Sequence, residues 1–114
     1  MFVRHERDAV PADLAGEEGI RGVELLPLIT DKDGARTFAM RLFRLEPAGH
    51  TPYHAHPWEH EVFVVRGSGE LIGESGSLPL EEGSAAYVNP SEKHRFRAGA
   101  RGMVFICCVP NRSR

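Results

Sequence analysis

Residues 54–65 read HAHPWEHEVFVV, and this stretch decides which fold the rest of the sequence supports. His54 and His56 are two residues apart, a spacing that places both imidazoles on one face of an extended strand. His60 follows at an even offset, so it can return to that face after a turn. Neutral imidazole is the commonest protein ligand for divalent transition metals. Together with the distant His94, the cluster favours a metal site over a solvated histidine-rich loop or hydrogen-bonded core histidines.

The length and composition of the chain are those of one ordinary globular domain. Its 114 residues suffice for a single buried core, and 41% of them are hydrophobic while 26% are charged. A net charge of −2 favours neither nucleic acid nor an anionic membrane as a partner. The longest apolar run, 103–110, is too short to span a bilayer, and the N-terminus lacks the apolar core of a signal peptide. We therefore expect one domain over residues 1–114, in the cytoplasm.

Apolar runs separated by turn residues predict strands along most of the chain. Val23–Thr30 is the first run, and Pro27 within it removes a backbone donor, which suggests an edge strand or a bulge. Thr37–Glu46 is the second run. Further strands are expected at 61–66, 70–73, 78–80, 84–88, 94–98 and 103–109, whereas residues 1–22 are expected to be loosely structured. About eight to ten short strands without a helical period indicate an all-β sandwich or barrel.

The alternation of side chains along these strands nominates residues for the interior. Arg41 is unusual within its largely apolar strand. It can form a salt bridge at a strand end or subunit contact, or it can point into a pocket, and the sequence leaves both alternatives open. Phe96 shares the face of His94 and is expected to point inward. Phe105 and Cys107 lie on one face of the last strand, with plain barrel core as the alternative to a pocket role.

The two cysteines, Cys107 and Cys108, are adjacent in the sequence. Adjacent cysteines rarely pair, and no other cysteine is present, so no disulfide framework is expected. A metal hook made of both is disfavoured because neighbours on a strand face opposite ways. A small, buried, hydrophobic cysteine is the commoner case.

Two segments resemble the motifs of the cupin superfamily. Residues 49–67, GHTPYHAHPWEHEVFVVRG, are similar to the first motif, with a glycine, HxH, an acidic position and a closing glycine. Residues 81–96, EEGSAAYVNPSEKHRF, are similar to the second, with a glycine, a proline and a histidine. The resemblance implies a single-domain cupin barrel, a jelly roll or double-stranded β-helix, with its motifs inside residues 49–97.

The sequence departs from the usual cupin pattern at one ligand. In that pattern a glutamate precedes the closing glycine by seven positions, and here that position is His60. Glu61 faces the opposite way on a strand and cannot replace it without a change of register. The chain therefore resembles small bacterial cupins of the manganese type that use four histidines. The implied ligands are His54, His56, His60 and His94.

Further residues are candidates for supporting roles around the metal. The resemblance implies that Cys107 faces the metal cavity. Glu59 and Glu61 are candidates to accept the free N–H of a ligand histidine, with solvated surface charge as the alternative. The asparagine that often follows the second-motif histidine is replaced by Ala98. Manganese is the favoured metal, and iron, nickel, copper and zinc also accept nitrogen ligands.

A metal held by four neutral imidazoles in an octahedral arrangement keeps two adjacent positions open, as catalytic sites do. We therefore predict a metal-dependent oxidoreductase of the oxygenase or dioxygenase type that acts on a small organic substrate. A non-redox isomerase or lyase is the first alternative, and a small-molecule binding or sensing module without turnover is the second, because fold alone does not fix function. The resemblance further implies a homodimer.

Overall fold

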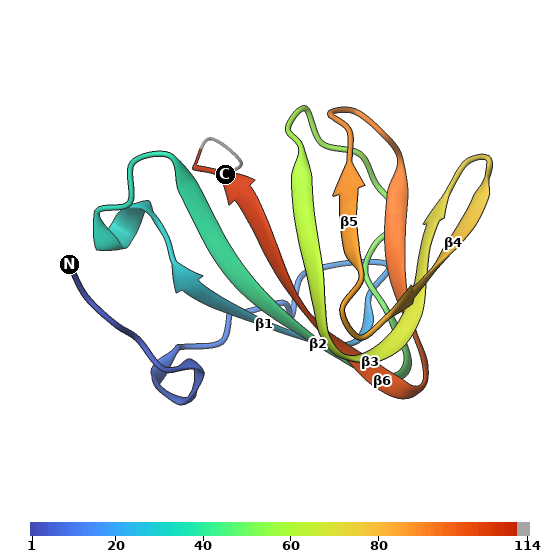
Figure 1. Ribbon diagram of the computed structural model, residues 1–114, viewed down its shortest axis with the longest axis horizontal. Coiled ribbons are helices and arrows are strands. Elements are labelled where there is room, and N and C mark those ends of the chain that lie inside the picture. Colours follow the sequence, from blue (N-terminus) through green and yellow to red (C-terminus); the bar gives the residue numbers. More distant parts are fainter. Residues whose placement is uncertain (112–114) are drawn as a thin grey trace.

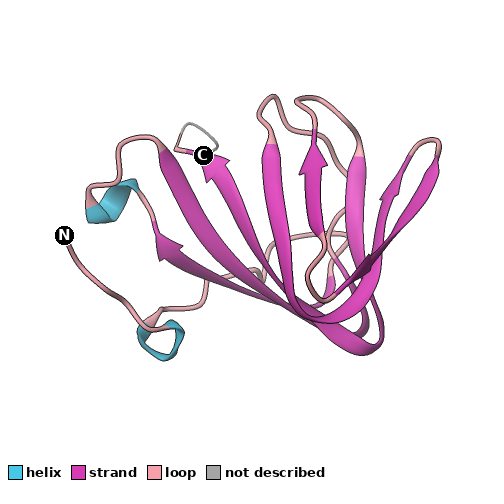
Figure 2. Cartoon of the chain, viewed as in Figure 1, coloured by secondary structure: helices cyan, strands magenta, loops and turns pink. Residues whose placement is uncertain are grey.

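The protein is built almost entirely from strands in the computed structural model, which describes residues 1–111 (Figure 1, Figure 2). The six strands of this part of the chain are β1 (Arg21–Ile29), β2 (Phe38–His50), β3 (His60–Gly73), β4 (Gly76–Glu81), β5 (Ala85–Val88) and β6 (His94–Pro110). Two single turns of 3-10 helix, η1 (Glu6–Asp8) and η2 (Asp31–Asp33), lie in the loops. The predicted all-β fold is confirmed. No helix among the described residues is long and apolar enough to cross a membrane.

The strands form one antiparallel sheet that bends into a barrel of the jelly-roll type. The order is β1-β2-β6-β3-β4, and β5 pairs with the first half of β3. Figure 1 shows β2, β3 and β6 converging where they bend and spreading apart toward the opposite end. We call the converging end, around Leu45, Gly67 and Met103, the closed end. The opposite end, where β3 begins at His60 and β6 begins at His94, is the histidine end.

The first strand meets both expectations derived from Pro27. β1 lies at one edge of the sheet, where a missing N–H costs no ladder hydrogen bond. The register with β2 also shifts between Pro27 and Ile29, which is a bulge. The turn after β1 is longer than a two-residue hairpin, since η2 ends at Gly34 in the left-handed conformation with φ of 93°.

The implied homodimer stays a prediction.

The expected number of strands is wrong, because several expected breaks are bends. β3 runs through Gly67–Gly69, β6 runs through Gly99–Gly102, and β2 continues through Pro47 to His50. Gly67 has a φ of 83°, and a Cβ there would collide with the carbonyl oxygen of Gly102. Glycine therefore lets two bent backbones approach closely, so the ladder continues on both sides of the bend.

The core fills the barrel between the inward faces of the strands. Val64 is fully buried, and Met103 and Phe105 are each 1% exposed. The remaining buried members of this cluster are Ala39, Leu45, Val62, Leu80, Val88, Phe96, Ala98, Cys107 and Val109. The apolar core extends from the closed end up to the floor of a pocket at the histidine end.

Candidate functional site

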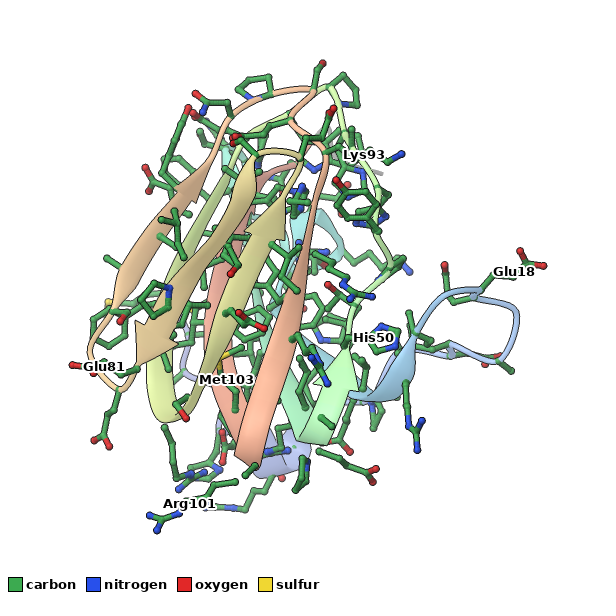
Figure 3. The ribbon with its side chains drawn as sticks, turned by 90° about the vertical axis from the view of Figure 1, so that its right-hand side faces the viewer. Glu18, His50, Glu81, Lys93, Arg101 and Met103 are labelled. Atoms are coloured by element: carbon green, nitrogen blue, oxygen red, sulfur yellow. The ribbon has the colours of Figure 1, made fainter. Side chains whose placement is uncertain are left out.

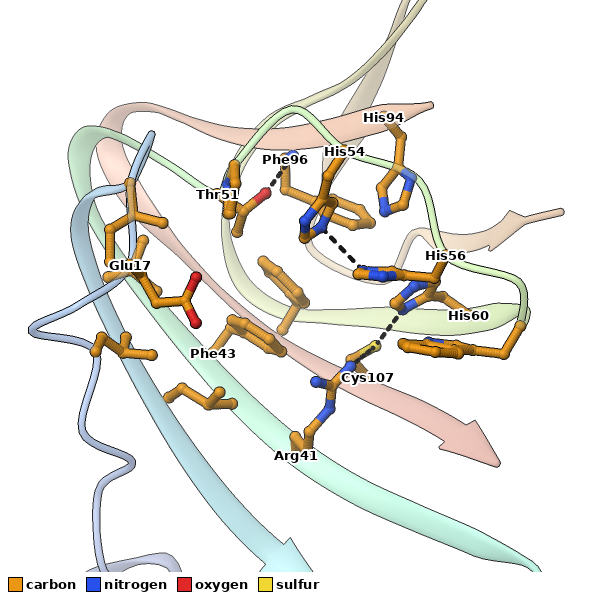
Figure 4. Close-up of a pocket in the computed structure, with 17 residues that line it drawn as sticks. Glu17, Arg41, Phe43, Thr51, His54, His56, His60, His94, Phe96 and Cys107 are labelled. Carbon is orange, nitrogen blue, oxygen red and sulfur yellow. Dashed lines mark hydrogen bonds between the residues drawn. The ribbon is translucent and has the colours of Figure 1, made fainter. Parts of the chain in front are cut away.

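A cavity of about 280 Å³ opens at the histidine end of the barrel (Figure 4). All four predicted ligand histidines and all four predicted pocket residues line it. The predicted set is His54, His56, His60, His94, Arg41, Phe96, Phe105 and Cys107. The cavity is also lined by Leu14, Glu17, Ile20, Val23, Leu25, Phe43, Thr51, Pro52 and Trp58. One pocket thus brings together residues from both motifs, from β2 and from the loop that precedes β1.

Backbone hydrogen bonds fix the loop that carries the first two histidines. The segment 51–59 is not a regular strand, in contrast to the expected extended conformation around His54 and His56. It is attached to the start of β6 instead, because His54 and His94 exchange two N–H···O bonds of 3.0 and 2.9 Å. Thr51 adds a second attachment, since its hydroxyl accepts the N–H of Phe96 at 2.9 Å. These bonds hold the two motifs against each other.

The four imidazoles lie close together on one side of the pocket. Their ring centroids are 4.1 Å apart for His54 and His56, and 5.1 Å apart for both His56–His60 and His60–His94. The Nε2 atoms of His54 and His56 are separated by 3.0 Å. Two ligand atoms at right angles on a metal with bonds of about 2.1 Å would be about 3 Å apart. This spacing fits two adjacent ligands of one metal.

Hydrogen bonds at the outer ring nitrogens orient two of the imidazoles. The Nδ1–H of His94 donates to the carbonyl oxygen of Glu92 at 2.8 Å, which leaves its Nε2 with a free lone pair. The Nδ1 of His60 lies 3.3 Å from the Sγ of Cys107, and its Nε2 is buried without a hydrogen-bond partner. A metal-ligating histidine commonly shows this arrangement, with one nitrogen anchored and the other available.

The surroundings keep the buried imidazoles neutral. Burial, with smaller contributions from the nearby His94 and Arg41, lowers the pKa of His60 to about 3. Burial, followed by the neighbouring His54, lowers the pKa of His56 to about 4. The pKa of His54 is also lowered, mainly by burial. Neutral imidazole is the form that binds metal, so at neutral pH no proton has to be displaced from these rings.

The side chains do not stand in a closed coordination geometry. Within residues 1–111, no group of three or more His, Cys, Asp and Glu side chains is arranged to hold a metal ion. The four-histidine site and its manganese therefore stay predictions. The donor set, the orphaned Nε2 of His60 and the anchored Nδ1 of His94 nevertheless fit a divalent metal.

Arg41 points into the cavity, which is one of the two alternatives that the sequence left open. Its Nη2 donates to the Sγ of Cys107 at 3.3 Å, and its Cζ lies 5.2 Å from the centroid of the Phe43 ring. Cys107 is 2% exposed, and burial raises the pKa of its thiol. A neutral thiol thus lies between a guanidinium and a candidate metal ligand.

Aromatic rings form the remaining walls. Phe43 stacks on Phe105 with centroids 4.9 Å apart and an interplanar angle of 11°, and Phe96 contacts Phe105 at 4.8 Å. Trp58 stacks on His56 at 4.5 Å and 6°. The pocket can therefore accept a flat apolar skeleton beside the histidines.

The two glutamates proposed to support the ligands lie elsewhere. The carboxylate of Glu59 accepts a short hydrogen bond from the hydroxyl of Tyr87. Glu61 is exposed and lies next to the inward-facing His60 on β3, so its side chain points outward. Neither carboxylate makes a hydrogen bond to a histidine within the described residues. The Nδ1 atoms of His60 and His94 instead face the thiol of Cys107 and the backbone carbonyl oxygen of Glu92, respectively.

Residues 13–20 contribute to the pocket although no sequence pattern predicts it. The sequence favours a loose loop here, yet Leu14, Glu17 and Ile20 line the pocket. Figure 4 shows the carboxylate of Glu17 turned toward the cavity. A glycine-rich stretch carries no periodicity, so no signal in it could have identified these side chains.

Comparisons with known proteins identify the family. The model of the cupin domain matches residues 41–109. The chain is 30% identical to the polyketide cyclase RemF from Streptomyces resistomycificus, over 97% of this chain and 80% of that one, with a TM-score of 0.87. A predicted oxalate decarboxylase from Thermotoga maritima is 18% identical, over 96% of this chain and 97% of that one, with a TM-score of 0.79. A comparison with curated proteins found no significant match. The chain belongs to the cupin domain family.

Proposed function

We propose that this protein is a metal-dependent enzyme that catalyses non-redox chemistry, with ring closure as its outcome, at a carbonyl group of a small keto compound. The observation that carries the proposal is the convergence of four imidazoles on a largely apolar pocket in which a free thiol, Cys107, contacts His60. The likeness to a polyketide cyclase over nearly the whole chain supports it. This choice places the first alternative from the sequence ahead of the oxygenase.

The Cys107 thiol is the reason for placing the carbonyl reaction ahead of the oxygenase. Cys107 contacts a candidate ligand, and activated oxygen species convert such thiols to sulfenic and sulfinic acids. An enzyme that handles oxygen at this position would damage its own pocket, whereas a carbonyl reaction leaves the thiol intact. The oxygenase is the second candidate, because an all-histidine site in an apolar pocket also suits iron or manganese.

The roles of the residues follow from their positions. His54, His56, His60 and His94 would hold a divalent metal, which supplies a Lewis acid that polarises a carbonyl oxygen. The stacked rings of the pocket wall would bind the carbon skeleton and exclude water. Manganese is our first choice from the resemblance, and the reaction does not require a redox-active metal.

Glu17 is assigned the proton transfer. It is the only carboxylate among the described residues that line the cavity. In ring closure, a proton leaves the carbon between two carbonyls, and that carbon bonds to a third carbonyl carbon. The oxygen of that third carbonyl then gains a proton. No electron donor or acceptor is consumed, so one carboxylate that accepts and returns a proton suffices.

The test uses metal-free protein reconstituted separately with zinc, manganese or iron(II) and a linear 3,5,7-trioxo acid as the probe. We expect liquid chromatography to show the linear acid converted to its cyclic isomer faster than in the metal-free control, without oxygen uptake, and with zinc supporting the reaction as well as iron does. The His60→Ala variant should lose this acceleration, while the outward-facing Phe63→Ala should retain it. Oxygen uptake that requires iron or manganese would instead establish the oxygenase.

A further inference from the structure

One guanidinium lies in the pocket without a carboxylate partner. Within residues 1–111, the inward-facing Arg41 donates a hydrogen bond to the thiol of Cys107 and lies over the ring of Phe43, and its buried Nε has no hydrogen-bond partner. Within residues 1–111, the arginines that form ion pairs are Arg4 and Arg44. The charge of Arg41 is therefore not balanced by the protein in its immediate surroundings.

Such an arrangement is costly unless a ligand completes it. Arg41 is half-buried, and a charge that is partly removed from water needs an opposite charge or a full set of hydrogen bonds, whereas a thiol sulfur is a weak acceptor. The face of Phe43 adds an attraction for the cation but no acceptor. The guanidinium thus retains unused N–H donors directed at the cavity.

The charges along the pocket also define a direction. Arg41 comes from β2 beside Cys107, while Glu17 comes from the loop before β1, and its carboxylate is turned toward the same cavity (Figure 4). An anionic group on a ligand is attracted to the first and repelled by the second. A guanidinium fork matches the two oxygens of a carboxylate and forms two parallel hydrogen bonds with them.

We infer that Arg41 binds a carboxylate of the substrate, so that the substrate class is a flat keto acid. This inference deepens the proposed function and rests on it. The stacked rings of Phe43 and Phe105 set the shape of the skeleton, and Arg41 sets its charge and its orientation. Neutral ketones of the same shape are then poor ligands.

The chain supplies its own reporter for this binding. Trp58 is the single tryptophan, and it stacks on His56 in the same pocket. Its fluorescence can be titrated with phenylacetate and with phenylacetamide, which share a shape and differ by one negative charge. We expect phenylacetate to bind to wild type about tenfold more tightly or better, because hydrogen bonds between charged groups are lost with the amide.

Three variants test whether Arg41 causes the preference for phenylacetate over phenylacetamide. Arg41→Gln should abolish it, and Arg41→Lys should retain part of it, because a lysine keeps the charge without the fork. Arg101→Gln removes the same charge from an exposed position at the closed end, far from Lys93 and the neighbouring histidine end in Figure 3, and should leave the preference unchanged. If Arg41→Gln does not fold, Arg41→Lys alone decides, and an unreduced preference in it overturns the inference.

Each titration is run on metal-free and on zinc-loaded protein. A preference for phenylacetate that needs zinc and survives in Arg41→Gln means that the carboxylate binds at the histidines, which overturns the inference. Equal affinity of wild type for both probes overturns it as well. A preference that follows Arg41 without metal supports it, even where the trioxo acid shows no ring closure. That last combination would reject the proposed function while leaving Arg41 as the carboxylate site.

Discussion

The closed end and the histidine end of the barrel are built from the same strands, yet they differ in how completely their buried groups are satisfied. At the closed end, Leu45 of β2 pairs with Met103 of β6, and both side chains are buried among apolar neighbours. At the histidine end, Arg41 pairs with Cys107 four residues along the same strands. Of the four buried side-chain atoms in residues 1–111 that lack a hydrogen-bond partner, three belong to Arg41, Trp58 and His60.

The difference shows how one barrel carries two tasks. The inward positions at one end are filled with side chains that need nothing but contact, so this end can stabilise the fold. The inward positions at the other end carry donors and acceptors that the protein leaves unpaired. Unpaired buried groups lower stability and are retained where a ligand uses them. The closed end therefore supports the pocket, and the pocket depends on that support.

The largest effect on stability is expected at the closed end. Met103→Ala should lower the free energy of unfolding by about 2–5 kcal/mol, because it leaves a cavity in a packed core. Urea unfolding followed by circular dichroism measures this change. The matched control is Phe63→Ala on the outer face, where the side chain is 50% exposed and the change should stay within about 0.5 kcal/mol. Equal losses in the two variants would contradict the division between the ends.

A substitution at the histidine end should weaken metal binding more than it lowers stability. His60→Ala removes a buried nitrogen that has no partner, so the metal-free protein should lose less stability than it does with Met103→Ala. Its affinity for zinc or manganese should fall by more than about 100-fold, since even residues that only support a ligand contribute about 10–100-fold. Competition with a chromogenic chelator measures this affinity. Full retention of metal would show that His60 is not a ligand.

The attachment between the two motifs is expected to have an intermediate effect. Thr51→Val removes the hydroxyl that accepts the buried N–H of Phe96, at a cost of about 1–3 kcal/mol for the unsatisfied donor. It should also weaken metal binding, because the same loop carries His54. Thr51→Ser keeps the hydroxyl and serves as the control. A drop in stability of similar size in Thr51→Ser would show that the methyl group matters more than the hydrogen bond.

A gradual loss of stability in acid is expected for the metal-free protein. In the unfolded chain a histidine titrates near 6.5, whereas burial lowers the pKa of His56 to about 4 and that of His60 to about 3 in the folded protein. Above pH 6.5 both states are neutral and stability is complete. Below it the unfolded state binds protons that the folded state does not, so stability falls until the folded imidazoles also titrate.

One variant separates the contribution of His60 to this pH dependence of stability from the contributions of other titrating groups. Urea midpoints of wild type and His60→Gln are compared at about pH 7 and about pH 5. The glutamine of the variant has no titratable group. The midpoint of His60→Gln should fall less between the two conditions. Parallel decreases in both proteins would mean that the buried imidazole does not govern the acid response.

Local sequence features predicted the elements but not all of their ends. Pro27 predicted an edge strand or a bulge, and the structure has both, because a missing N–H has the same meaning in any fold. The glycines at 67 and 102 indicate strand ends in the sequence, although the structure uses them to bend β3 and β6. A glycine permits either outcome, and only the neighbouring strand, which bends at the same place, decides between them.

The candidate site divides in a similar way. Clustered histidines, the alternation along β2 and β6, and the resemblance to cupins predicted eight residues that the structure gathers in one cavity. The roles suggested for Glu59 and Glu61 depended on neighbours that are distant in sequence, and the structure gives Tyr87 to the first and the outer face to the second. Contacts of this kind depend on strands that are far apart in the sequence and pack together only in the folded protein.

The sequence by itself determined the all-β class, the histidine cluster and the inward faces, because alternation and turn chemistry act between near neighbours. The tertiary structure alone decided that Arg41 lies unpaired beside Cys107, and that Glu17 reaches the pocket from an irregular loop. The physical reason is that these placements depend on which backbones pair across the barrel, and such pairings are fixed by the whole core and not by any one segment.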